Sequence, residues 1–306
     1  MYVTRVSQYI IHATFYLLLH FMFFGAHVSI AGGVFNAPLN SAALGGEVFQ
    51  MFTRSPQGGS VPELTPEIVA LFKKNCELLG QREWYVHCPY FINFASANPR
   101  IKHGSSAVIR QELERSTLLS AKYVMAHLGS YKDLGPEKGF EELILGLEKV
   151  VTGYTGSAQF LIELSAGAGS PIGHTFEDLA KIIFHPKLKK YHIGICYDTQ
   201  HAFASGYDIR TPEAVKSTFD KFDKIIGLDN LKMFHCNDSK IEFNGHKDRH
   251  EHIGDGHIGR AGFEALLGDK RLKDKNFICE TEHDKVKEDL KILKKIRIRV
   301  DKKSLL

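Results

Sequence analysis

Histidines and carboxylates recur at one kind of position in this chain, at or directly after the ends of short apolar runs. Imidazole nitrogens and carboxylate oxygens, with few thiolates competing, are ligands that suit zinc, and also manganese or iron. Six successive runs end in this way, at His87, His127, Glu163, Asp198, His235 and Glu280. One histidine in such a place is more often a hydrogen-bonded structural residue, so the prediction of metal binding depends on the whole set.

Three more candidate ligands lie close in sequence to two members of this set. His201 comes three residues after Asp198, and Asp248 and His250 stand two positions apart in the loop that follows the His235 run. Positions two apart in an extended segment face the same side, so Asp248 and His250 can bind one ion together. The full set exceeds the needs of one tetrahedral ion, and so many buried acids would repel one another without cations. We therefore predict a cluster of metal ions.

The cysteines indicate packing rather than metal binding. The chain has five, with no C-x-x-C pair, so no disulfide framework is expected and a reducing cytoplasm is the simplest location. Cys88, Cys236 and Cys279 each stand directly beside a predicted ligand. Because side chains alternate along a strand, ligands that point inward would leave these cysteines pointing outward, toward covering helices.

The apolar runs have the length and the β-branched or aromatic content of buried strands. They span residues 23–28, 48–52, 84–88, 123–127, 160–164, 192–197, 231–236 and 277–279. Amphipathic, helix-like segments between them include residues 66–79, 105–120, 137–150, 211–226 and 262–267. This alternation predicts an α/β fold, a single closed (β/α)₈ TIM barrel with its active site at the C-terminal face of the strands. Neither a G-x-G-x-x-G after the first run nor a Walker-type loop is present, so nucleotide binding has no support.

Three regions follow from this assignment. Residues 22–298 are predicted to form the barrel domain, and residues 299–306 a basic tail after a final helix within 291–303. Residues 1–21 are an apolar extension, too short and too interrupted by histidine for a membrane span. We hypothesise that Met22 is the natural start, and we expect no membrane association. The net charge of +4 is compatible with a polyanionic partner without requiring one.

A glycine-rich segment, residues 254–259, has two interpretations. It could form a phosphate-binding loop, but a turn leading into the last helix is the preferred interpretation. His252, just before this segment, and His257, within it, are interpreted as loop residues.

Several segments of the chain resemble the endonuclease IV family. Its three signature segments are matched by residues 87–93 (His-Cys-Pro-Tyr-Phe-Ile-Asn), by residues 194–201 (Gly-Ile-Cys-Tyr-Asp-Thr-Gln-His), and by residues 235–240 followed by 248–256, which look like them. Residues 25–33 are similar to its opening strand and loop. Glu163 and Glu280 fall where its remaining metal carboxylates do, and the resemblance covers roughly residues 22–295.

The resemblance implies a trinuclear zinc site. By position, the first ion would be held by His87, His127 and Glu163. The second, to which Glu163 would bridge, would also be held by Asp198, His235 and Glu280. The third would be held by His201, Asp248 and His250.

The resemblance also implies an activity. A family member would hydrolyse the phosphodiester bond 5′ to abasic sites in double-stranded DNA, as a step of base excision repair. Cleavage would leave a 3′-hydroxyl and a 5′-deoxyribose phosphate. Glu163, as the bridge between two ions that activate water, would be the catalytic residue, and Tyr90 resembles a residue that contacts DNA. A monomer is expected.

The chain departs from the family pattern in the loop formed by residues 52–59. This loop lacks the usual basic residue followed by Trp, and Gln57 stands near the place where an Arg commonly inserts into the DNA stack. Arg54 is the candidate substitute for that DNA contact. No departure falls on a predicted metal ligand.

Two other functions compete with the nuclease. A xylose-isomerase-like sugar isomerase or epimerase also carries Glu, Asp, His and Glu at successive strand ends, but it does not require His201, Asp248 and His250. A catalytically silent DNA-binding barrel would keep the fold without the reaction. Metal content and turnover of a ketose separate the first from a nuclease, and binding of an abasic duplex without nicking would identify the second.

Overall fold

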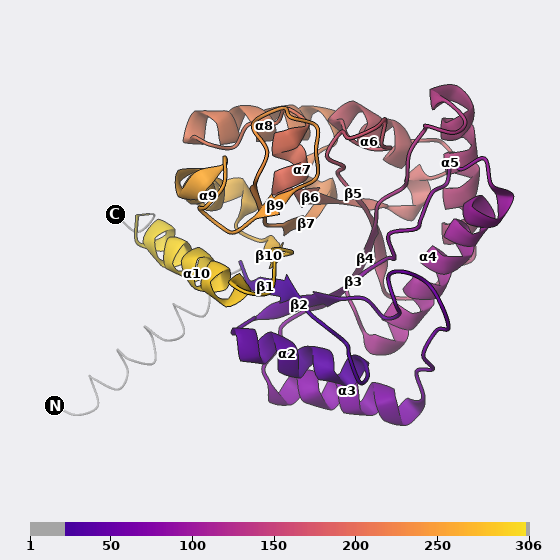
Figure 1. The fold of residues 1–306 in the computed structure, drawn as a ribbon, viewed down its shortest axis with the longest axis horizontal. Coiled ribbons are helices and arrows are strands. Elements are labelled where there is room, and N and C mark those ends of the chain that lie inside the picture. The colour runs from indigo at the N-terminus through magenta and orange to yellow at the C-terminus, as the bar shows by residue number, and fades with distance from the viewer. Residues whose placement is uncertain (1–21, 304–306) are drawn as a thin grey trace.

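Eight parallel strands close into a barrel in the computed structural model, which describes residues 22–303 (Figure 1). Neighbouring strands pair in chain order from β1 to β7, and β10 closes the ring by pairing with both β7 and β1. The strands are β1 (Phe24–His27), β2 (Val48–Met51), β3 (Trp84–His87), β4 (Tyr123–Ala126), β5 (Gln159–Glu163), β6 (Gly194–Asp198), β7 (Leu231–His235) and β10 (Asn276–Cys279). Every apolar run of the sequence forms one of them, so the predicted TIM barrel is confirmed.

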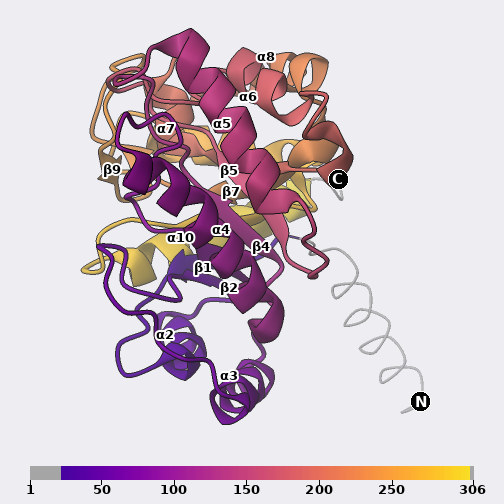
Figure 2. The same cartoon turned by 90° about the vertical axis from the view of Figure 1, so that its right-hand side faces the viewer.

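Helices surround the barrel (Figures 1 and 2). They are α2 (Ala37–Leu44), α3 (Pro66–Leu78), α4 (Pro99–Leu119), α5 (Pro136–Val151), α6 (Phe176–Ile183), α7 (Thr199–Ala204), α8 (Pro212–Ile225), α9 (Gly259–Gly268) and α10 (Val286–Lys303). Short 3₁₀ turns lie at Val34–Asn36, Lys189–Tyr191, Leu228–Asn230 and Lys270–Leu272. The two-residue strands β8 (Asp238–Ser239) and β9 (His250–Glu251) form an antiparallel pair in the segment between β7 and β10.

Side-chain caps explain where several helices begin. Thr65 and Thr211 accept backbone N–H groups at the starts of α3 and α8, each followed by Pro at the first helical position. Helix α4 begins at Pro99, six residues before the predicted start, because Asn98 caps it in the same way. The helices that the sequence did not predict, α2, α6 and α7, have only six to eight residues.

Two apolar layers hold the barrel together. Inside the ring, the packed side chains are Val48, Tyr85, Tyr123, Met125, Leu161, Cys196, Met233 and Ile278. A larger layer between the strands and the helices contains Cys88, Cys236 and Cys279. The outward orientation predicted for these three cysteines is therefore confirmed.

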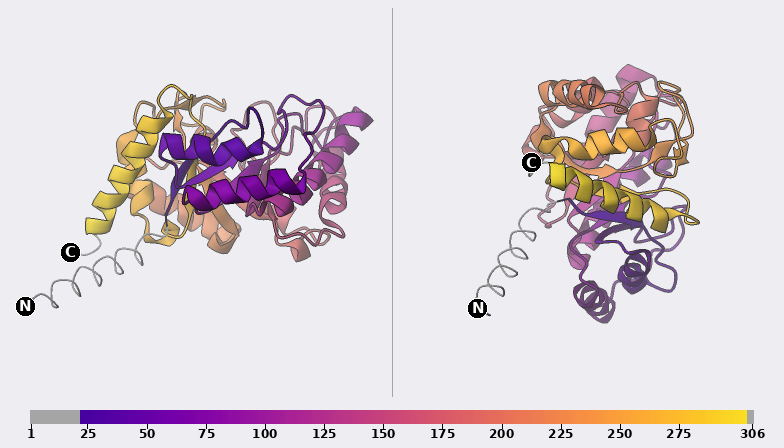
Figure 3. Two further views of the ribbon diagram at one scale, coloured as in Figure 1. Left: turned by 90° about the horizontal axis from the view of Figure 1, so that it is seen from below. Right: turned by 90° about the vertical axis from the view of Figure 1, so that its left-hand side faces the viewer.

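Helix α10 packs beside α9 and against β1 (Figure 3). It begins at Val286, five residues before the predicted final helix, and runs to Lys303 through the expected boundary between domain and tail at 298. Arg297 on this helix donates to the carbonyl of Met22 and to the carboxylate of Glu47. None of the helices within residues 22–303 combines the length and apolarity that a membrane crossing requires. The hypotheses about residues 1–21 lie outside the described part of the chain.

The loop after β2 is anchored to α4 by a buried ion network. Glu112 on α4 pairs with Arg54 and accepts from the hydroxyl of Thr53 at 2.6 Å. Arg115, one turn further along α4, donates to the hydroxyl and the carbonyl of Thr53 and to the carbonyl of Pro62. Glu112 has no exposed surface and Arg54 is 6% exposed, so each charge depends on the other for compensation.

Removal of the Glu112 carboxylate should therefore destabilise the fold. We expect Glu112→Ala to lower the free energy of unfolding by about 3–5 kcal/mol, because Arg54 is left with an uncompensated buried charge. Urea denaturation measures the change. The matched control is Glu114→Ala on the same helix, where an exposed pair with Arg110 should be worth less than about 1 kcal/mol. Equal effects of the two substitutions would contradict the anchoring role of Glu112.

Candidate metal centre

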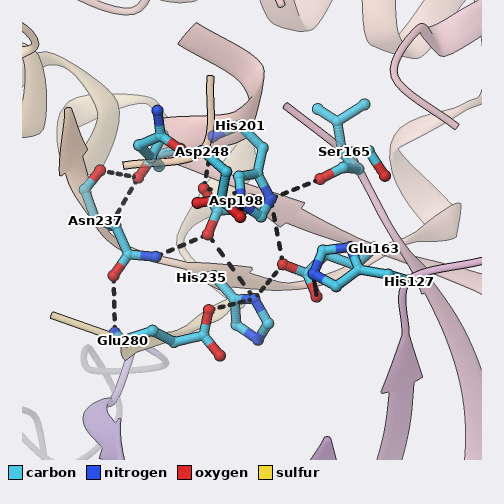
Figure 4. A network of polar contacts seen from close by, with 12 residues as sticks. His127, Glu163, Ser165, Asp198, His201, His235, Asn237, Asp248 and Glu280 are labelled. Carbon is cyan, nitrogen blue, oxygen red and sulfur yellow. Dashed lines mark hydrogen bonds and ion pairs between the residues drawn. The ribbon is translucent and has the colours of Figure 1, made fainter. Parts of the chain in front are cut away.

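The predicted ligands meet at the carboxyl end of the barrel (Figure 4). His87, Glu163, Asp198 and His235 are the last residues of β3, β5, β6 and β7, while His127 and Glu280 directly follow β4 and β10. In a parallel barrel these ends share one rim, which explains why residues far apart in sequence converge. Three groups of potential ligand atoms result, with atoms no more than 4.8 Å apart within each group.

The first group contains His87, His127 and Glu163. The Nε2 atoms of the two histidines lie 3.0 and 3.3 Å from Oε2 of Glu163. Glu163 has no exposed surface, whereas the side chain of His127 is 28% exposed. The group is therefore closed at its base and open at its outer side.

The second group contains Glu163, Asp198, His235 and Glu280. Nδ1 of His235 lies 2.9 Å from Oε1 of Glu163, 3.1 Å from Oε2 of Glu280 and 3.9 Å from Oδ2 of Asp198. Glu163 thus presents one oxygen to the first group and the other to the second. This is the arrangement that a carboxylate bridging two cations requires.

The third group contains Asp198, His201 and His250. Asp248 lies beside it, with one oxygen 3.3 Å from Nε2 of His201 and the other 3.3 Å from Nε2 of His250. Asp198 was assigned to the second ion alone, but its Oδ2 is also 3.8 Å from Nε2 of His250. Its Oδ1 accepts the backbone N–H of His201 and caps α7, so Asp198 is both a helix cap and a member of two groups.

Hydrogen bonds to backbone carbonyls orient two of the imidazoles. Nδ1 of His87 lies 2.6 Å from the carbonyl oxygen of Cys88, and Nδ1 of His201 lies 2.9 Å from that of Leu164. A carbonyl only accepts, so each Nδ1 carries a hydrogen, and Nε2 is the ring nitrogen that a cation at the centre would bind.

The electrostatics favour cations at this rim. Burial alone would raise the pKa of Glu163, but His127, His235 and His201 hold it well below its usual value. Burial lowers the pKa of His127 to about 4, so its ring is neutral at pH 7 and can donate a lone pair. Within residues 22–303, neither lysine nor arginine pairs with Glu163, Asp198, Asp248 or Glu280. A donor set of carboxylates and imidazoles without a fixed cation fits several divalent metal ions.

The two predicted DNA-binding residues have different surroundings. Tyr90 is 65% exposed and lies beside the centre, with its ring 5.4 Å from that of Phe52 and 5.7 Å from that of His87. Arg54 instead turns inward to Glu112 and Gln111. The prediction that Arg54 contacts DNA does not agree with this buried ion pair: Arg54 anchors its loop, and Gln57 is exposed.

The glycine-rich segment forms a turn, as predicted, but it leads into α9 and not into the last helix. The carboxylate of Asp238 accepts backbone N–H groups of Gly254, Ile258 and Gly259, which occupies the donors that a phosphate loop would need. His252 is more than a loop residue, because it is 7% exposed and its Nδ1 lies 2.8 Å from the buried carboxylate of Asp289 on α10.

Two amides next to the ligands were not predicted. Asn237 donates to Oδ2 of Asp198 and accepts the backbone N–H of Glu280 (Figure 4). Gln50, in the middle of β2, contacts both His235 and Glu280. A polar residue inside an otherwise apolar strand was the signal available in the sequence for Gln50.

The fold and the site together define a class, that of TIM-barrel proteins with a carboxylate–histidine centre at the strand ends. A family model described as "Xylose isomerase-like TIM barrel" matches residues 39–296. "Probable endonuclease 4" of Chlorobium phaeobacteroides (strain BS1) is 39% identical over 263 residues, which cover 85% of this chain and 92% of that protein. "Probable endonuclease 4" of Halothermothrix orenii is 38% identical over 258 residues, 84% and 92% of the two chains.

Solved structures agree with these sequence matches. Endonuclease IV from Thermus thermophilus superposes with a TM-score of 0.80 at 31% identity, covering 90% of this chain and 99% of that one. A D-tagatose 3-epimerase-like protein shares the fold, with a TM-score of 0.69 at 19% identity. The chain belongs to the endonuclease IV family.

Metal binding at this centre should stabilise the folded protein. Cations that bind only the native state at about a thousand times their Kd add roughly 4 kcal/mol, which corresponds to a rise in Tm on the order of 10 °C. We expect stripping with 1,10-phenanthroline to lower the Tm in calorimetry and added Zn²⁺ to restore it. Glu163→Gln should abolish most of the recovery. An unchanged Tm on stripping and reloading would contradict the assignment of the three groups to metals.

Proposed function

We propose that this protein is a zinc-dependent endonuclease that hydrolyses the phosphodiester bond 5′ to abasic sites in duplex DNA. Cleavage leaves a 3′-hydroxyl and a 5′-deoxyribose phosphate. The protein acts as a monomer in base excision repair. The observation that carries the proposal is the complete set of three ligand groups, with Glu163 shared between two of them. The five free, buried cysteines support a cytoplasmic location, where thiols remain reduced.

The ligands have distinct proposed places in the centre. His87, His127 and Glu163 would hold one zinc ion, and Asp198, His235 and Glu280 would hold a second, with Glu163 shared between the two. His201, Asp248 and His250 would hold the third, with Asp198 close enough to contribute. Divalent cations in these positions supply activation of water at neutral pH and neutralisation of phosphate charge.

The chain's own residues would bind and orient the substrate. His127, His250 and Asp248 are the more exposed ligands, so the scissile phosphate would approach from their side. The buried oxygens of Glu163 and Asp198 fix the inner atoms of the site, so the geometry needs little reorganisation when DNA binds. The net charge of +4 favours a polyanionic ligand.

Recognition of the lesion falls to the aromatic surface beside the centre. The exposed ring of Tyr90, supported by Phe52, can stack on a nucleotide next to the abasic site. An abasic nucleotide is cheap to extrude because it has no base to unstack. Gln57 occupies the exposed part of the neighbouring loop, where it can enter the gap with a neutral side chain.

The direct test is cleavage of a duplex that contains one tetrahydrofuran abasic analogue. Wild-type protein should nick it 5′ to the lesion and should withstand low concentrations of EDTA, because the inner ligands are buried. Glu163→Gln should lose activity by a factor on the order of a thousand or more, since it removes the negative charge shared by two groups. Binding without nicking by zinc-loaded wild type would identify a silent DNA-binding barrel, and ketose turnover without nicking would identify a sugar isomerase or epimerase.

A second substitution separates binding from chemistry. Tyr90→Ala should weaken affinity for the abasic duplex by about 1–3 kcal/mol, the usual contribution of an aromatic ring stacked on a base. The rate constant of cleavage under single-turnover conditions should change much less. Tyr90→Phe should behave nearly as wild type. A loss confined to the cleavage rate constant, with an unchanged Kd in a fluorescence titration, would contradict the proposed DNA contact.

A further inference from the structure

Gln50 is a polar residue in the wall of the barrel, directly beside the candidate metal centre. It lies on β2 between Phe49 and Met51 and has no exposed surface. Phe49 and Met51 pack outward against the helices, so Gln50 points into the ring. A buried amide costs free energy unless its polar atoms are hydrogen-bonded, so the amide of Gln50 needs hydrogen-bond partners inside the ring.

The amide of Gln50 has three polar neighbours. Its Nε2 lies 2.6 Å from Oε1 of Glu280 and 3.0 Å from Nδ1 of His27. Its Oε1 lies 2.7 Å from Nε2 of His235. Two of these neighbours, Glu280 and His235, belong to the same group of potential metal ligands.

These contacts place a hydrogen on Nε2 of His235. The ionised carboxylate of Glu280 can only accept, so the side facing it must be the NH₂ group of Gln50. The amide oxygen therefore faces His235, and an oxygen there requires Nε2 of His235 to donate. Nδ1 of His235 faces the carboxylates of Glu163 and Glu280 at 2.9 and 3.1 Å, so it is the ring nitrogen that a cation in this group would bind.

Dependence on a side chain sets His235 apart from two other imidazoles of the centre. His87 and His201 are oriented by backbone carbonyls, which no substitution removes. The side chain of Cys196 also lies against His235, but its sulfur is a weak acceptor. The amide oxygen of Gln50 is the strong acceptor available to Nε2.

We propose that Gln50 is a positioning residue for the metal centre: it fixes His235 in the Nε2–H tautomer, so that this histidine binds metal through Nδ1, and it orients Glu280 on the same ion. The inference deepens the proposed function and rests on it, because it takes the second ligand group to hold zinc. Hydrogen-bond partners of this kind typically change metal affinity by about 10–100-fold when they are removed.

The test measures zinc binding by Gln50→Met, which keeps the length of the side chain and removes its hydrogen bonds to His235, Glu280 and His27. Competition with a chromophoric chelator should show one of the bound zinc ions weakened by about 10–100-fold, with the other sites unchanged. The matched control is Met51→Leu, the next residue on the same strand, which points away from the site and should bind zinc as wild type does. Circular dichroism establishes that both variants are folded.

A second measurement requires no substitution. Two-bond ¹H–¹⁵N correlation spectra of zinc-loaded wild type, with ¹⁵N-labelled histidine, report which ring nitrogen of His235 carries hydrogen. The proposal expects hydrogen on Nε2 and zinc on Nδ1. Hydrogen on Nδ1, or equal zinc affinities for Gln50→Met and wild type, would overturn the role of Gln50 while the proposed nuclease stands. A wild-type protein that binds no zinc would instead overturn the proposed function itself.

Discussion

Buried carboxylates need positive charge beside them, and this requirement governs the mouth of the barrel. Glu163 and Asp198 have no exposed surface at the mouth of the barrel, and within residues 22–303 neither of them pairs with a lysine or arginine. Imidazoles from neighbouring strands and loops surround them at close range. The same geometry that lets histidines approach the acids leaves space that divalent cations can share. The barrel supplies the rigid rim on which these side chains are held.

The centre changes character from its base to its opening. At the base, amides and backbone carbonyls saturate the remaining polar atoms, as Asn237 does for Asp198. At the opening, Asp248 and His127 retain exposed surface, and Tyr90 presents an aromatic face beside them. A fixed base and an accessible rim suit a site that keeps its metals while admitting a large substrate. The fold alone does not decide the reaction, because sugar epimerases of the same fold share its barrel at 19% identity or less.

The strands and the convergence of the candidate ligands could be predicted from the sequence, because hydrophobic periodicity marks the strands and a parallel barrel brings their carboxyl ends together. Contacts between side chains that are distant in sequence could not be predicted in the same way. The amino-acid sequence places Arg54 in a loop, but only the fold brings Glu112 of α4 beneath it. It shows Gln50 inside a strand, but not that its two ends meet His235 and Glu280. Short helices such as α7 were missed because six residues hold too few turns for a periodic signal.

The proposed metal centre requires that side chains from six strand ends, from α7 and from one loop enclose a compact group of divalent cations. A crystal structure of the purified protein, with anomalous diffraction recorded on both sides of the zinc absorption edge, tests it most directly. The account predicts three zinc peaks, one within each of the three ligand groups, with two of them bridged by Glu163. A single peak, or peaks away from Glu163, would contradict it.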